Sequence, residues 1–145
     1  MILIDTNVIS ELWKITPDPG VLDWIDAQAI ETLYLSAITV AELRFGLAIM
    51  PRGKRREIYQ KRLEHEVLPA FMGRVLPFDL DTSQAYATLM EQAKTEGKAI
   101  STADGYIAAT AAIRALTIAT RDIAPFQAAG LTVINPWKTS VVADH

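Results

Sequence analysis

Short apolar runs that alternate with helix-like segments constrain the fold of this chain more than any other feature. The runs, bounded by polar or turn-forming residues, lie at residues 2–4, 33–35, 74–78, 116–119 and 131–134. Brief apolar runs of this kind are typical of strands buried on both faces. Strands that alternate with helices pair in parallel and are covered on both sides. The order therefore predicts an α/β fold, a three-layer sandwich with a central parallel sheet.

The helical segments are marked by apolar periodicity and by residues that start or stop helices. Helices are expected to start after Asp5, at Val21, at Thr39, at Lys54, at Asp81 or Thr82, and at Ser101. Pro69 should end the charged helix that starts at Lys54, because proline disrupts a helix interior. In a parallel sheet flanked by helices, functional side chains gather beyond the carboxyl ends of the strands.

The size and composition indicate one cytoplasmic domain. The 145 residues are 50% hydrophobic and include no cysteine, which excludes thiolate catalysis and zinc–thiolate sites. We expect a single domain over residues 1–137 and a flexible tail over 138–145. The start lacks the basic and apolar segments of a signal peptide. The most apolar later stretch, 106–120, is too short to span a membrane. The net charge of −3 argues against a protein that simply coats nucleic acid.

Four acidic residues are expected at the functional edge of the sheet. Asp5 directly follows the first apolar run, and Asp122 follows the fourth. Glu42 should lie in the first turn of the helix after the second strand, and Asp104 in the first turn of an alanine-rich helix. All four carboxylates would then meet on one side of the molecule.

Each acid also has a purely structural explanation. Thr39 and Glu42 have the spacing of a capping box, and Ser101 and Asp104 nearly have it. The other two acids are good N-cap residues for the helices that follow them. Taken singly, capping is the stronger interpretation of each acid, because helix N-termini favour carboxylates in any case.

Taken together, the four acids favour a metal site. Carboxylates that converge on one edge repel one another, which raises their pKa values or destabilises the fold. A divalent cation removes this conflict, and a set of oxygen ligands selects Mg²⁺ or Mn²⁺. Such an ion activates water and shields the charge of a phosphate, which are the requirements of phosphodiester hydrolysis.

Four motifs give this chain a specific resemblance to a known family. They read ILIDTNVISE at 2–11, LSAITVAELR at 35–44, ADGYIAAT at 103–110 and ATRD at 119–122. In this order and spacing they closely resemble the PIN-domain toxins, in the VapC/FitB-like branch of type II toxin–antitoxin systems. The resemblance extends from residue 1 to 137.

The resemblance implies an endoribonuclease that uses Mg²⁺ or Mn²⁺ and is held inactive by a co-expressed antitoxin. Asp5 and Asp104 match the first and third metal-binding acids of the family, while Glu42 and Asp122 match the second and fourth. Thr6 and Thr120 stand beside two of the acids and are candidates to orient them.

The family also implies partners. Its members form homodimers and larger toxin–antitoxin assemblies, and they bind operator DNA only through the antitoxin. The substrate would be RNA, which for some relatives is a transfer RNA. No membrane partner is expected.

Two other functions remain open at this point. Asp79 and Asp81 superficially match the motif of haloacid-dehalogenase-like phosphatases, although the residues that follow are too few for that fold. A non-catalytic binding protein would use the four acids only as helix caps.

A basic segment at 52–62 also has two interpretations. It could contact RNA phosphates, or it could be a solvated helix face; nearby glutamates favour the second.

Overall fold

Five short parallel strands form the centre of the structure, a computed structural model that describes residues 1–139. The strands are β1 (Ile2–Ile4), β2 (Leu33–Ser36), β3 (Val75–Leu76), β4 (Thr117–Ala119) and β5 (Val133–Ile134). They are ordered β3-β2-β1-β4-β5, so β1 is central, and every pair is parallel. The predicted α/β class with a parallel sheet is confirmed. Residues 140–145 of the expected tail lie outside the described residues.

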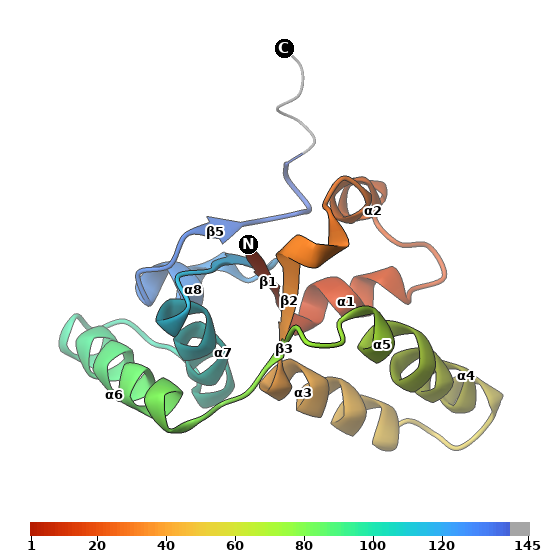
Figure 1. Cartoon of the computed structure of the whole chain (residues 1–145), viewed down its shortest axis with the longest axis horizontal. Helices are drawn as coiled ribbons and strands as arrows, with labels where there is room; N and C mark the ends of the chain where they lie inside the picture. The colour runs from red at the N-terminus through yellow and green to blue at the C-terminus, as the bar shows by residue number, and fades with distance from the viewer. Residues whose placement is uncertain (140–145) are drawn as a thin grey trace, which may run out of the picture.

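Helices cover both faces of this sheet. They are α1 (Thr6–Leu12), α2 (Pro19–Asp26), α3 (Ala37–Ala48), α4 (Lys54–Arg62), α5 (Leu68–Ala70), α6 (Leu80–Thr95), α7 (Thr102–Ile113) and α8 (Ile123–Ala128), with a 3₁₀ turn at Ile30–Thr32 and a π turn at Leu63–Val67. In Figure 1, α6, α7 and α8 lie on one side of the strands, and α1, α2, α4 and α5 lie on the other.

Two hydrophobic cores result from this arrangement. Successive residues of a strand point to opposite faces. Ile4 accordingly packs with Val8 and Leu43 in one core, while Leu3 packs with Ile107 and Phe126 in the other. Because β1 is buried on both faces, its end is a fixed point from which side chains can be placed accurately.

The structure corrects several predicted helix boundaries: α2 begins at Pro19 rather than at Val21, and α6 at Leu80 rather than at Asp81 or Thr82. Helix α3 begins at Ala37, not at Thr39, because the Ser36 hydroxyl caps it by accepting from the Ile38 amide at 3.0 Å. The charged helix does not stop before Pro69. A π turn widens the helix there, and Pro69 lies in the first turn of α5, where its ring and missing N–H are tolerated. Within residues 1–139, no helix is both long and apolar enough to cross a membrane.

Candidate functional site

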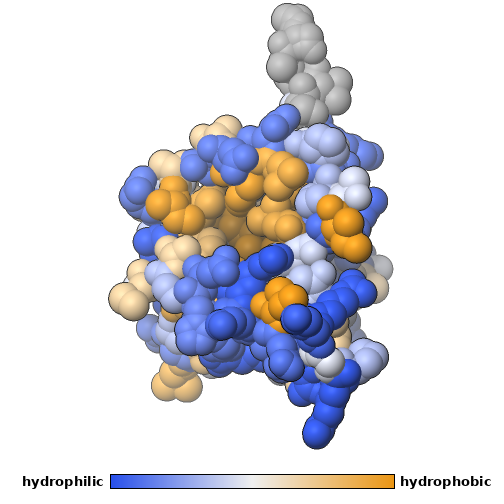
Figure 2. Space-filling view, turned by 90° about the vertical axis from the view of Figure 1, so that its right-hand side faces the viewer, coloured by the Kyte–Doolittle hydropathy of each residue, from blue (hydrophilic) through white to orange (hydrophobic). Residues whose placement is uncertain are grey.

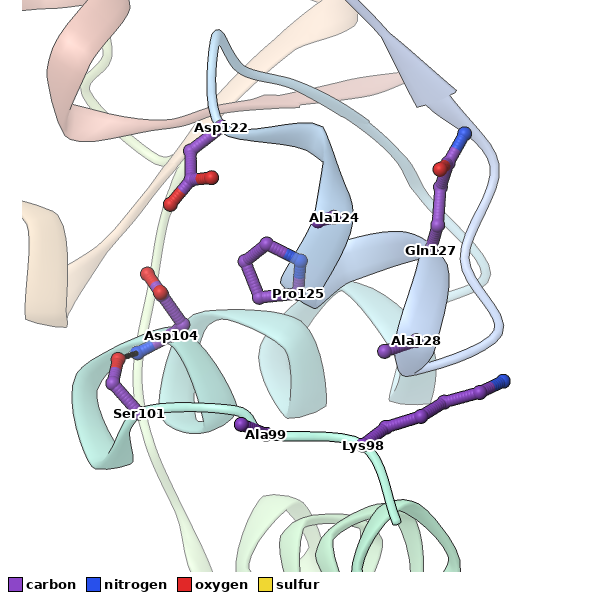
Figure 3. Close-up of a pocket in the computed structure, with 9 residues that line it drawn as sticks. All are labelled: Lys98, Ala99, Ser101, Asp104, Asp122, Ala124, Pro125, Gln127 and Ala128. Atoms are coloured by element: carbon purple, nitrogen blue, oxygen red, sulfur yellow. Dashed lines mark hydrogen bonds between the residues drawn. The ribbon is translucent and has the colours of Figure 1, made fainter. Parts of the chain in front are cut away.

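The four acids predicted from the sequence all lie beyond the carboxyl ends of the central strands. Asp5 follows β1, Glu42 lies in α3 after β2, and Asp122 follows β4, while Asp104 comes from α7. Asp104 lines two cavities: one of about 420 Å³ that also contains Asp5 and Glu42, and one of about 580 Å³ that also contains Asp122. Figure 3 shows the Asp104 and Asp122 carboxylates pointing toward one another.

Asp5 is the most buried of the four acids, with 5% of its surface exposed. Its Oδ1 accepts from the Thr6 amide at 2.8 Å, and its Oδ2 accepts from the Thr120 hydroxyl at 2.8 Å. Burial raises the pKa of Asp5 to about 6 in spite of these two hydrogen bonds, and the charges of Asp104 and Glu42 push it in the same direction. The carboxylate is therefore held in place, but its charged form is destabilised by burial and by the neighbouring acids.

Glu42 is not a helix cap. Since α3 begins at Ala37, Glu42 lies in its second turn, and Thr39, its expected capping partner, is completely buried. The prediction that Glu42 sits in the first turn is wrong, because Ser36 supplies the cap instead. The Glu42 Oε1 accepts from the Thr6 hydroxyl at 2.6 Å. The capping explanation is thus removed for the one acid that matched a capping box in full.

Asp104 lies in the first turn of α7, as predicted, and its amide donates to the Ser101 hydroxyl at 3.2 Å. Partial burial raises its pKa, and the Asp122 charge contributes. Asp122 occupies the N-cap position of α8, yet its side chain makes no capping hydrogen bond. Its backbone N–H instead donates to the Thr120 hydroxyl at 3.1 Å, which leaves the exposed carboxylate directed at Asp104.

Asn7 is a site residue that the sequence did not reveal. Its Nδ2 donates to Asp5 Oδ2 at 3.3 Å and to Thr120 Oγ1 at 3.2 Å, and its Oδ1 accepts from the Arg121 amide at 3.2 Å. One side chain therefore fastens the turn after β1 to the turn after β4. The only sequence signal is an asparagine two residues after the acid, which usually indicates a local turn.

The donor set fits a hard divalent cation. All four candidate ligands are carboxylates, and oxygen ligands suit Mg²⁺ and Mn²⁺. Burial is the main reason that the pKa values of Asp5 and Asp104 are raised, and the charges of the neighbouring acids raise them further. Within residues 1–139, no three acidic or histidine side chains lie close enough together, as they stand, to hold one metal ion. The four carboxylates therefore fit a divalent cation by the type of their ligand atoms and by their negative charge, which a cation would neutralise.

Two basic side chains share the cavity of Asp5 and Glu42. Lys14 pairs with the buried Glu11 at 2.8 Å, and Arg121 lies over the Trp137 ring at 5.1 Å. Neither is hydrogen-bonded to the predicted acids in the described part of the chain, so the site keeps its negative charge.

The residues of the competing interpretations have other roles. The Asp79 Oδ1 caps α6 by accepting from the Thr82 amide at 3.0 Å and from its hydroxyl at 2.7 Å. Asp79 and Asp81 line neither of the two cavities that hold the four acids. In the basic segment, Arg55 and Arg62 lie over the Tyr59 ring at 5.5 and 5.7 Å. Between residues 1 and 139, no ion pair joins two residues of α4, and Glu64 of the following π turn pairs instead with Arg44 of α3 at 2.8 Å.

Comparisons with known proteins all find similarity to PIN-domain proteins and VapC/FitB toxins. Residues 2–131 match the model of the PIN domain family. The chain is 72% identical over 138 residues to the VapC ribonuclease Y4jK of Sinorhizobium fredii, covering 95% of this chain and 99% of the relative. It is 53% identical to the toxin FitB of Neisseria gonorrhoeae, covering 94% and 99%.

Solved structures give the same result. The crystal structure of FitAcB from Neisseria gonorrhoeae matches with a TM-score of 0.94 and 52% identity, covering 96% of this chain and all of that one. A structure of FitAB bound to an IR36 DNA fragment matches with a TM-score of 0.93 and 50% identity, covering 96% and 97%.

Proposed function

The chain belongs to the PIN-domain family, in its VapC/FitB toxin branch, and on this premise we propose that it is a metal-dependent endoribonuclease toxin. One observation carries the chemistry: four carboxylates from four separate segments line two cavities that meet at Asp104, beyond the carboxyl ends of the strands, and two of them have raised pKa values. The 72% identity to a VapC ribonuclease supports RNA as the substrate.

In this proposal the four acids have different roles in binding a Mg²⁺ or Mn²⁺ ion. When bound, the ion would lower the pKa of a coordinated water and shield the charge that develops on the phosphate. Asp5 and Asp104 would be the main ligands. Glu42 and Asp122 would complete the pocket and orient the attacking water or a second ion.

Hydrogen bonds to the acids determine which oxygens remain available. Oδ2 of Asp5 already accepts from Thr120 and Asn7, so its Oδ1 is the better placed to bind a cation. Oε1 of Glu42 is held by Thr6, which leaves Oε2 free within the described structure. Fixing ligands through a surrounding layer of hydrogen bonds is a common way to tune a metal site. Thr6 and Thr120 are positioning residues in this account.

The partners in this proposal are an antitoxin, a second copy of the chain and, through the antitoxin, operator DNA. A relative of 50% identity is described in a complex bound to DNA. Figure 2 shows an apolar hollow in a face of mixed hydrophilic and apolar residues, on the side where α2 and α4 lie in Figure 1. Exposed apolar hollows commonly bind other proteins. The toxin would act in the cytoplasm, where its RNA substrate is present.

Metal removal and restoration test this function. The purified chain should cleave single-stranded RNA or transfer RNA with Mg²⁺ or Mn²⁺, stop in EDTA, and recover when Mn²⁺ is returned. Calorimetric titration with Mn²⁺ should detect binding that Asp104→Asn removes. Expression without the upstream neighbouring gene should arrest growth, and co-expression should relieve the arrest. RNA cleavage that continues unchanged in EDTA would refute the metal mechanism.

A further inference from the structure

The larger cavity beside the acids is a groove between α8 and the loop that joins α6 to α7. Asp104 and Asp122 form one end of it, and Lys98 and Gln127 lie toward the other, where the polar ends of both exposed side chains point away from the two acids (Figure 3). Its remaining walls are small and neutral: Ala99, Ser101, Ala124, Pro125 and Ala128. Its volume of about 580 Å³ lies within the range of sites that bind small organic groups.

The two cavities that meet at Asp104 differ in charge. The cavity of Asp5 and Glu42 contains Lys14 and Arg121, which suit phosphate oxygens. Beyond the acids, the described residues that line the groove include one cation, Lys98, whose ammonium pairs with Glu96 at 3.0 Å. A phosphate has little to bind along its alanine and proline walls, whereas a ribose and base are neutral and have large apolar faces.

We propose that this groove binds the nucleoside next to the scissile phosphate, and that the exposed Gln127 side chain turns toward the groove to contact the edge of its base. The inference rests on the proposed function, because it takes the acids as the place of cleavage. The groove opens directly from Asp104 and Asp122, so a phosphate held at the acids directs its adjoining sugar into it. An amide both donates and accepts hydrogen bonds, and can therefore distinguish bases. Gln127 is a specificity-determining residue in this model.

Two substitutions test the groove, each with a matched control. Ala124 and Ala87 are both exposed helical alanines, but only Ala124 lines the groove. Gln127 and Gln84 are likewise both exposed, and only Gln127 lies in it. Ala124→Trp fills the groove and Gln127→Leu removes the base contact. Ala87→Trp and Gln84→Leu make the same chemical changes on α6, away from the acids.

The readouts are cleavage of a randomised single-stranded RNA pool, with the cut ends sequenced, and binding of a labelled hexaribonucleotide in Ca²⁺. Ala124→Trp should weaken binding and lower kcat/KM by about tenfold or more. Gln127→Leu should change the base preference at one position beside the cut by about fivefold or more, the discrimination that one base contact provides. Both controls should behave as the wild type.

The outcomes separate the two proposals. If the wild type cleaves RNA and the groove variants match their controls in binding, kcat/KM and base preference, the groove proposal is overturned and the nuclease remains. If the wild type cleaves no RNA with either metal, the proposed function fails. In that case the binding comparison still decides whether the groove holds a nucleoside: weaker binding by Ala124→Trp alone supports it, and equal binding rejects it.

Discussion

The Thr120 hydroxyl donates a hydrogen bond of 2.8 Å to Oδ2 of Asp5, across the ends of the neighbouring parallel strands β4 and β1. Asn7 donates to the same oxygen and to Thr120. The direction of the buried Asp5 carboxylate is therefore set by two strands and one turn, while its Oδ1 accepts only the adjacent Thr6 amide among the described residues. Such fixed orientation reduces the cost of arranging a ligand when a cation binds.

The raised pKa of Asp5 predicts a pH-dependent stability of the metal-free protein. Its pKa is about 6 in the folded state and 3.8 in the reference state, so the folded state binds more protons between these values. The contribution of Asp5 to the free energy of unfolding is complete below pH 3.8 and is lost as the pH rises through 6. Between pH 4.5 and 7.5 this loss is about 2 kcal/mol, at about 1.4 kcal/mol for each pKa unit.

Urea unfolding in EDTA measures this effect when the wild type is compared with Asp5→Asn. The stability of the wild type relative to the variant should fall from pH 4.5 to pH 7.5, because every other titrating group is common to both proteins. Added Mg²⁺ should then stabilise the wild type at pH 7.5 more than the variant. Parallel pH profiles for the two proteins would show that Asp5 titrates normally.

Asn7→Ala should weaken metal binding and cleavage by roughly 10–100-fold, the usual effect of removing a residue that orients a ligand. The change deletes the contacts to Asp5, Thr120 and the Arg121 amide while leaving all four acids in place. Titration with Mn²⁺, followed by calorimetry, checks the affinity separately from turnover. An unchanged Mn²⁺ affinity would mean that Asn7 only stabilises the turn.

Gly105→Ala should destabilise the protein by roughly 1–3 kcal/mol, the range for overpacking a core. A Cβ at this position would lie 2.7 Å from the Met90 sulfur and 2.9 Å from the Tyr86 ring, so these two side chains of α6 must shift. Asp104 precedes this glycine, so cleavage should fall as well. Gly46→Ala is the control, because its Cβ meets nothing within 4 Å. Equal melting temperatures for the two variants would contradict this interpretation.

Substitutions at Asp79 and Asp81 test the phosphatase alternative. Asparagine is also a good N-cap, so Asp79→Asn should preserve α6 and leave RNA cleavage unchanged, and Asp81→Asn should do the same. Asp79→Ala should lower the melting temperature because the bonds to Thr82 are lost. If the wild type releases phosphate from a phosphomonoester and either asparagine variant does not, the phosphatase alternative would be favoured.

The succession of strands and helices along the chain, and the place of the acids after the strands, were predictable because both depend on local pattern. Each strand is a buried apolar run, and the carboxyl ends of parallel strands meet at one edge. Asp104 was placed correctly because Ser101 is a strong N-cap and does cap α7. Ser36 and Thr39, by contrast, are both good caps, and the burial that decides between them depends on packing around α3.

Other features depend on contacts between distant segments. Asn7 bridges to residues more than a hundred positions away, and no local pattern contains that information. The helix that starts at Lys54 continues past Pro69. This continuation depends on a π turn at the point where the helix packs on the core through Leu63. Which cavity each acid faces also follows from tertiary structure alone.

RNA cleavage by Glu42→Gln tests the central claim most directly. Glu42 does not cap a helix, and glutamine can still accept the hydrogen bond from Thr6, so the fold should remain intact while the charge of a metal ligand is lost. The account predicts a fall of roughly 100-fold or more in cleavage rate with Mg²⁺ or Mn²⁺, at an almost unchanged melting temperature. Cleavage by purified Glu42→Gln at the wild-type rate would contradict the four-carboxylate mechanism.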